Sequence, residues 1–119
     1  MVCNGRRPSD TPSESDWKLF RERRQEWIGR YYTRVLTECA EDLYGPSTPS
    51  ERFWILEKHI HEQKRILWKL EELRRNTMSR LIVDMLELKI ITFADLEGFS
   101  DHLIKCAKEA LDIHKSIHV

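Results

Sequence analysis

Glycine and proline are scarce in this chain of 119 residues, which contains four of each. Both residues destabilise helix interiors, and most of these eight lie in expected loops or at expected helix ends. Their scarcity therefore favours a helical protein. Long apolar runs are absent too, since none approaches the roughly 20 residues that a membrane-spanning helix needs. We expect no membrane segment and no membrane partner.

Net charge is also lacking, because 20 Lys and Arg residues balance 20 Asp and Glu residues. Such a chain has no overall positive field to attract nucleic acid or anionic lipid. Cysteine is sparse, and Cys3, Cys39 and Cys106 form neither a CxxC pair nor a disulfide framework. We therefore predict a cytoplasmic, reducing location, with Cys39 and Cys106 as ordinary packed thiols.

The four letters TPSE occur twice, at Thr11–Glu14 and at Thr48–Glu51. In each copy the threonine can cap a helix, the proline suits the first helical position, and the glutamate can reach back to the cap. Two copies are too few for a solenoid repeat. We interpret the two TPSE sequences as two similar helix starts. We expect the first helix to run from residue 11 to about residue 43.

The second helical pattern covers residues 49–89, and no Gly or Pro interrupts residues 50–97. As one helix this segment would be about 60 Å long, whereas a compact domain of this size is roughly 35 Å across. Either the helix breaks, and then at Asn76-Thr77, or the molecule is elongated or oligomeric; we favour the break. The expected core stripe before the break comprises Phe53, Leu56, Ile60, Leu67 and Leu70.

The last third of the chain is clearly punctuated. Thr92 and Asp95 make a further capping box, Gly98 stops a short turn, and Ser100 can cap a final helix. The sequence therefore predicts an all-α helical bundle with two long antiparallel helices and two or three shorter C-terminal helices. We assign residues 1–10 to a flexible tail and residues 11–119 to a single helical domain.

Motifs that carry chemistry are missing. There is no glycine-rich phosphate loop, no GxSxG motif and no Glu-x-x-His pattern of a di-iron bundle. His59 and His61 are two positions apart, so they point to different sides of a helix and cannot share one metal. We predict no catalytic residue, no cofactor, no metal site and no enzymatic activity.

Nucleic-acid binding is the alternative function. Residues 78–115 have the proportions of a helix–turn–helix, and Arg74, Arg75 and Arg80 could contact phosphates. The second helix of this segment, SDHLIKCAKEALDIHK, offers few Arg, Asn or Gln side chains to read base edges. We therefore consider nucleic acid an unlikely partner, although the sequence leaves it open.

Aromatic residues away from the main stripe provide the strongest functional signal. Trp54, His61 and Trp68 are spaced by seven residues and line one seam of the second helix. Exposed aromatics supply much of the energy at protein interfaces, but a bundle could also bury them. We predict a regulatory or accessory protein that binds a protein partner and forms a homodimer. Its contact residues would be the seam together with Trp27, Tyr31 and Tyr32.

Three stretches resemble short all-helical proteins of bacteria whose function is unassigned. They are DWKLFRERRQEWIGRYY, TPSERFWILEKHI and IITFADLEGFSDHL, and the likeness in layout covers most of residues 15–105. The most specific part is the Ser-Glu-Arg-Phe-Trp helix start followed by the Ile-Thr-x-x-Asp-Leu-Glu-x-Phe-Ser turn. The resemblance implies a compact helical domain and carries no functional residue with it.

Overall fold

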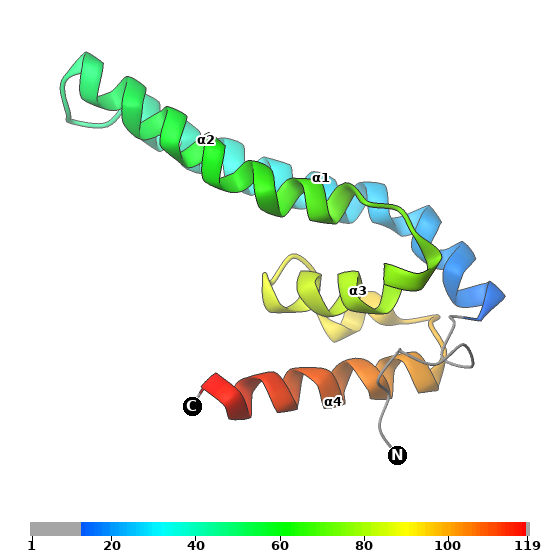
Figure 1. Ribbon diagram of the computed structural model, residues 1–119. Coiled ribbons are helices and arrows are strands. Elements are labelled where there is room, and N and C mark those ends of the chain that lie inside the picture. The colour runs from blue at the N-terminus through cyan, green and yellow to red at the C-terminus, as the bar shows by residue number, and fades with distance from the viewer. Residues whose placement is uncertain (1–12, 119) are drawn as a thin grey trace. The chain divides into compact units, whose positions relative to one another are not determined.

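The computed structural model describes residues 13–118, and it describes residues 113–118 by their backbone alone. Within this range the chain is helical and contains no strand, so the predicted all-α class is confirmed (Figure 1). The tail predicted for residues 1–10 lies outside the described residues. In chain order the elements are α1 (Glu14–Leu43), α2 (Pro49–Glu71), the 3₁₀ helix η2 (Arg75–Thr77), α3 (Met78–Glu87), the 3₁₀ helix η3 (Phe93–Leu96) and α4 (Asp101–His118).

The described residues fall into two compact units that share α1. Residues 28–72 form the first, which we call the hairpin unit, and it contains the second half of α1 with all of α2. Residues 13–27 and 73–118 form the second, which we call the C-terminal unit. The long first helix therefore contributes to both hydrophobic cores.

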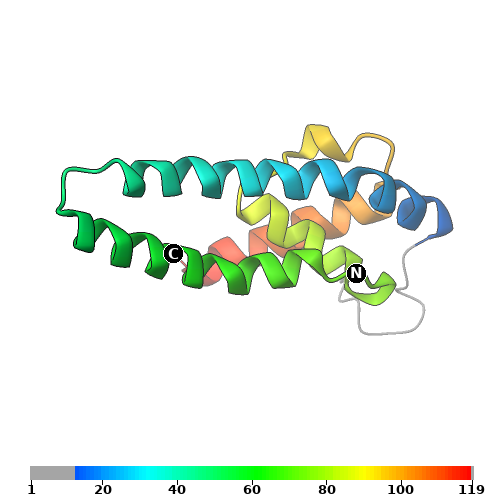
Figure 2. The same cartoon turned by 90° about the horizontal axis from the view of Figure 1, so that it is seen from above.

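The hairpin unit consists of two antiparallel helices, which run side by side in both views (Figures 1 and 2). The second TPSE starts α2 as predicted, because Thr48 is the cap and exchanges hydrogen bonds with Glu51, while Pro49 occupies the first position. Near the loop, Arg52 Nη1 donates to the carbonyl oxygen of Leu43 at 2.9 Å. The two long antiparallel helices are thus confirmed.

The start of α1 differs from the prediction. The helix begins at Glu14, and the hydroxyl of Ser13 accepts a hydrogen bond from the backbone N–H of Asp16 at 3.1 Å. Ser13 therefore caps this end of α1, and the predicted cap Thr11 lies outside the described residues.

The predicted break in the second helical segment is present, a few residues earlier than Asn76-Thr77. The helix α2 ends at Glu71, and the backbone of Glu72 and of Arg74 is extended. A single turn of η2 then leads into α3 at Met78. An uninterrupted helix over 49–89 is therefore excluded.

The C-terminal unit has a dense hydrophobic core. Its helices α3 and α4 pack side by side (Figure 1). The ring of Trp27 contacts both Phe20 and Phe99, with centroids 6.2 Å apart in each case. Fully buried or nearly fully buried side chains are Phe20, Trp27, Met78, Leu81, Ile82, Met85 and Leu96.

A polar connection ties the start of α1 to the start of α4 within the C-terminal unit. Asp16 is only 3% exposed, and its carboxylate accepts hydrogen bonds from the backbone N–H of Ser100 at 2.8 Å and from its hydroxyl at 2.6 Å. The Ser100 hydroxyl in turn accepts from the N–H of Leu103, which confirms it as the cap of α4. This pairing of residues 84 positions apart orders the junction between η3 and α4.

The predicted turn before α4 is also confirmed. Asp95 accepts a hydrogen bond from the backbone N–H of Thr92 at 2.9 Å, and Gly98 has a φ of 98°. A side chain would be strained at this φ, and a Cβ at Gly98 would lie 3.2 Å from Leu19 Cδ2. Arg23 Nη1 donates to the carbonyl oxygens of Asp95 and Glu97, which holds the turn against α1.

Candidate interaction surface

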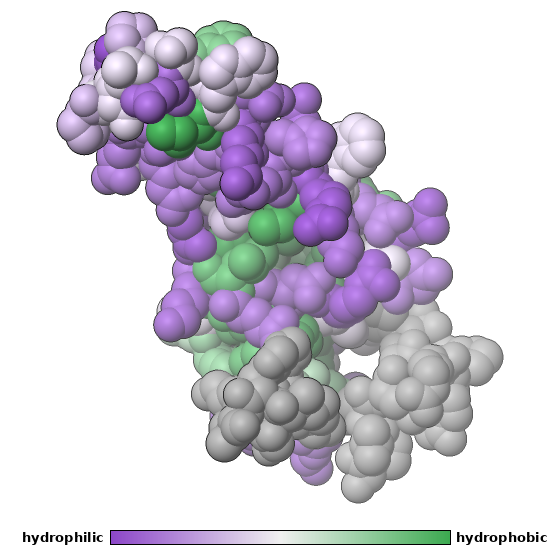
Figure 3. Space-filling view, turned by 60° about the vertical axis from the view of Figure 1, so that its left-hand side comes forward, coloured by the Kyte–Doolittle hydropathy of each residue, from purple (hydrophilic) through white to green (hydrophobic). Residues whose placement is uncertain are grey.

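Exposed hydrophobic side chains are concentrated in the hairpin unit. Ten large hydrophobic residues of the described chain are exposed, and nine of them lie in residues 28–72. In Figure 3, hydrophobic patches interrupt a largely hydrophilic surface near the loop end of the hairpin. Scattered exposed hydrophobics are normal, whereas a concentration in one unit marks an interaction surface. The nine are Tyr32, Leu36, Leu43, Tyr44, Phe53, Trp54, Ile55, Ile60 and Trp68.

The predicted tryptophan seam lies on the surface of α2. The side chains of Trp54 and Trp68 are 64% and 81% exposed, and His61 between them is exposed as well. The ring of Trp54 stands edge-on to Phe53, with centroids 5.0 Å apart. The alternative in which these tryptophans are buried inside a bundle is therefore wrong for the described chain.

The other predicted contact residues are placed differently. Trp27 and Tyr31 are 2% and 4% exposed, so the prediction that they form a contact surface is wrong. They lie on the stripe of α1 that faces inward, and burial raises the pKa of the Tyr31 phenol. Tyr32 is 38% exposed and donates a hydrogen bond to Glu71 at 3.0 Å, which raises its pKa. Only Tyr32 of the three remains available.

An apolar groove runs between α1 and α2 within the hairpin unit. Its volume is about 450 Å³. Part of the stripe predicted to be core is open to solvent. Ile60, which lines the groove, is 42% exposed, and Phe53, which does not line it, is 59% exposed, while Leu70 is buried. Hydrophobic periodicity predicts an apolar stripe but does not show whether another helix covers it, so the groove could not be predicted from the sequence. The residues that define the apolar groove are Tyr32, Val35, Leu36, Cys39, Ala40 and Leu43 of α1 with Leu56, Ile60, Gln63, Lys64 and Leu67 of α2.

A histidine clip joins the two helices of the hairpin unit. His59 Nδ1 lies 2.7 Å from Asp42 Oδ2, and His59 Nε2 lies 3.2 Å from Glu38 Oε1. The hydrogen bond to Asp42 raises the pKa of His59 above its usual value, which favours the doubly protonated ring. Among the described residues, no group of three or more His, Cys, Asp or Glu side chains has the arrangement of a metal site.

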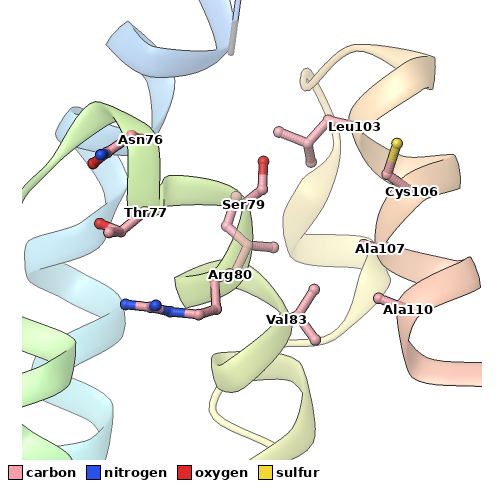
Figure 4. Close-up of a pocket in the computed structure, with 10 residues that line it drawn as sticks. Asn76, Thr77, Ser79, Arg80, Val83, Leu103, Cys106, Ala107 and Ala110 are labelled. Carbon is pink, nitrogen blue, oxygen red and sulfur yellow. The ribbon is translucent and has the colours of Figure 1, made fainter. Parts of the chain in front are cut away.

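A second cavity of about 360 Å³ lies in the C-terminal unit, between the start of α3 and α4. Val83, Leu103 and Ala110 line its interior, and Ser79 and Arg80 lie on the α3 side (Figure 4). The lining is mixed: Ile82, Val83, Leu103, Ala107 and Ala110 are apolar, whereas Asn76, Thr77, Ser79 and Arg80 are polar.

The predicted helix–turn–helix geometry is not present. The helices α3 and α4 are separated by the long connection of residues 88–100, which contains η3, whereas the motif uses a turn of about three or four residues. Of the arginines proposed for phosphate contacts, Arg75 forms an ion pair with Glu14, while Arg74 and Arg80 are exposed. Phosphate contacts by these three arginines stay a prediction that no observed geometry supports.

The cysteines follow the prediction only in part. Cys39 is a free, buried thiol at the edge of the apolar groove, and burial raises its pKa. Cys106 is disulfide-bonded, so the prediction of an ordinary packed thiol is wrong at this position. Spacing along the chain gave no sign of this bond.

Comparisons with known proteins provide no relative. No protein family, no curated protein and no solved structure matches the chain. Among the described helices, none combines the length and the apolar character that crossing a bilayer requires. The surface of the hairpin unit therefore provides the strongest functional argument.

Proposed function

We propose that this protein is a small non-catalytic interaction module, acting as a regulatory or accessory protein, whose hairpin unit binds a protein partner and forms a homodimer. The observation that carries the proposal is the exposure of Trp54 and Trp68 on one seam of α2. Exposed tryptophans are costly to keep in water and are enriched among the residues that dominate binding energy.

The surroundings of the seam suit a protein partner. Arg65 and Glu62 lie between the two tryptophans in sequence, so both signs of charge accompany the aromatic side chains. Apolar anchors within a mixed polar rim are typical of protein interfaces. The chain has zero net charge, which offers no general attraction to nucleic acid.

Substitution of the seam tests the proposal. The partner is first identified by cross-linking in host cells and mass spectrometry, and its affinity is then measured by calorimetry. We expect Trp54→Ser with Trp68→Ser to weaken binding by at least about 30-fold, as for two interface anchors. Leu73→Ser is the control, because Leu73 is a 45% exposed hydrophobic residue of the C-terminal unit, outside the candidate interaction surface. Equal affinity of the seam variant and the wild type would refute the role of the seam.

The proposed cytoplasmic location has a separate test. Disulfides are rare in the reducing cytoplasm, so a cytoplasmic protein should carry Cys106 as a thiol in the cell. Iodoacetamide added at lysis, followed by peptide mass spectrometry, measures this directly. Labelling of Cys106 without prior reduction supports the cytoplasm, and labelling only after reduction contradicts it.

A further inference from the structure

We infer that the apolar groove is covered by the same groove of a second copy, so that two hairpin units form a four-helix bundle. The inference rests on the proposed function, since it names the surface and the geometry of the homodimer. It leaves the tryptophan seam at the outer edge of the bundle, where a different protein can reach it.

The first argument is that α1 carries two apolar stripes. Val35 and its neighbours face inward, and Leu36, one residue further and so about 100° round the helix, is 66% exposed. Gly29, Leu36 and Leu43 are spaced by seven residues and are all exposed. A helix with a single neighbour buries a single stripe, so the second stripe indicates a second neighbour.

The second argument is the register of the hairpin. Tyr31 donates a hydrogen bond to Gln63, and Glu38 pairs with His59. Since the helices are antiparallel, these pairs place Leu36 of α1 at about the same level as Ile60 of α2. One twofold axis at this level, perpendicular to the helices, would pair α1 with α1 and α2 with α2 of the second copy, each antiparallel.

That axis makes the α1 surfaces complementary in shape. Leu36 meets Leu36 of the second copy at the axis. Tyr32 then lies opposite Ala40, and Gly29 lies opposite Leu43, so a large side chain faces a small one in each case. A Cβ at Gly29 would meet no atom of the described chain within 4 Å, which leaves room for the second copy.

The same axis makes the α2 surfaces complementary in charge. Phe53 lies beside Leu67 of the second copy, and Glu57 comes close to Lys64 of the second copy. Twofold symmetry repeats this contact, so the interface contains two pairs of Glu57 with Lys64, and each pair joins opposite charges. Lys64 is the only charged residue that lines the apolar groove among the described residues, and the pairing supplies it with a carboxylate.

The exposed area is of the right size. A stable interface of standard size buries about 800 Å² on each partner. Five large side chains on this face are between 38% and 66% exposed. If the full surface of each side chain is about 200 Å², their exposed fractions together contribute on the order of 500 Å². The groove floor and the polar rim add the rest. The five are Tyr32, Leu36, Leu43, Phe53 and Ile60.

Mass in solution is the first test. Sedimentation velocity of the full chain over a range of concentrations should show a species of twice 14.3 kDa. Leu36→Glu places two carboxylates against each other at the axis and should give only the 14.3 kDa species. Thr37→Glu introduces the same residue one position away, on another face of α1, and should remain dimeric. Circular dichroism checks that all three proteins keep their helical content.

Enlarging Gly29 is the second test, and it avoids adding a charge. Gly29→Leu has open space in the single chain, so it should fold normally, but it should abolish the dimer by colliding with Leu43 of the second copy. Gly29→Ala is the control of smaller volume and should weaken the dimer less. A dimer unaffected by Gly29→Leu would overturn the proposed packing.

A charge exchange distinguishes a second copy from any other occupant. Glu57→Lys and Lys64→Glu should each weaken the dimer, because each places like charges together. A mixture of the two variants should form the heterodimer, in which both contacts again have opposite signs. No recovery in the mixture would overturn the antiparallel pairing of α2.

The experiments distinguish a failure of the groove-to-groove dimer from a failure of partner binding by the seam. A wild-type chain of 14.3 kDa at every concentration overturns self-association, whether or not the seam binds a partner. If Leu36→Glu then abolishes partner binding, the groove holds a helix of another protein, which also overturns the second copy. A dimer broken only by the seam substitutions would move the homodimer to the seam.

Discussion

Single polar residues connect distant parts of each unit, and Asp16 is the clearest case. It stands near the start of α1, and its carboxylate binds both the N–H and the hydroxyl of Ser100. Removing a buried acceptor leaves its donors unpaired, which costs more than the hydrogen bond contributes.

We therefore expect Asp16→Ala to lower the free energy of unfolding by about 2–3 kcal/mol, measured by urea denaturation. Asp101→Ala is the matched control, because Asp101 is an exposed acid in the first turn of α4. Its loss should cost about 0.5 kcal/mol through the helix dipole alone. Equal losses for the two variants would contradict the role given to Asp16.

His59 makes the stability of the hairpin unit depend on pH. Its pKa is raised in the folded state by the hydrogen bond to Asp42, above the ordinary value of 6.5. Because the folded pKa exceeds the unfolded one, the stabilisation is complete below pH 6.5 and is lost as pH rises through the raised pKa.

His59→Gln should remove this part of the pH dependence, as measured by thermal unfolding at several pH values from 5 to 9. The control is His61→Gln, which changes an exposed histidine of the same helix and should keep the wild-type profile. A wild-type profile in His59→Gln would show that the clip does not stabilise the fold.

At the scale of helices, boundaries set by neighbouring residues could be predicted from sequence. Thr48 and Glu51 start α2, and Gly98 and Ser100 separate η3 from α4, because a cap or a positive φ depends on local chemistry alone. The helix α1 begins at Glu14, three residues later than predicted. Its cap Ser13 binds the backbone N–H of Asp16, whose carboxylate is paired with Ser100 far along the chain.

Which face of a helix is buried could not be predicted in the same way. Trp27 and Trp68 are both aromatic residues in amphipathic helices, yet one is 2% and the other 81% exposed. Hydrophobic periodicity locates a stripe but not the element that covers it. The spacing of Trp54, His61 and Trp68 predicts the tryptophan seam. The apolar groove could not be predicted, because spacing does not show that no helix covers that stripe.

Stability measurements separate the two tryptophans. Trp27→Ala should lower the free energy of unfolding by about 3–5 kcal/mol because it empties a packed core. Trp68→Ala should change it by less than about 0.5 kcal/mol, as expected for an exposed site. Urea denaturation of the dimer-deficient Leu36→Glu background gives both values without a contribution from association. A large loss for Trp68→Ala would contradict its surface position.

At the scale of the whole molecule, the hairpin unit keeps more apolar surface in water than folding requires. Among the described residues, Leu73 is the one exposed large hydrophobic residue of the C-terminal unit, whereas the hairpin unit leaves nine exposed. This contrast between two parts of one small protein is the basis of the account. It indicates that the hairpin unit completes its packing against other molecules.

The native mass of the protein in an extract of its host cells tests this claim most directly. Size-exclusion chromatography with immunodetection should find the wild-type chain in assemblies of at least twice 14.3 kDa. A variant that combines Leu36→Glu, Trp54→Ser and Trp68→Ser should elute as a folded monomer. Elution of the wild-type chain at 14.3 kDa, with no larger species, would contradict the account.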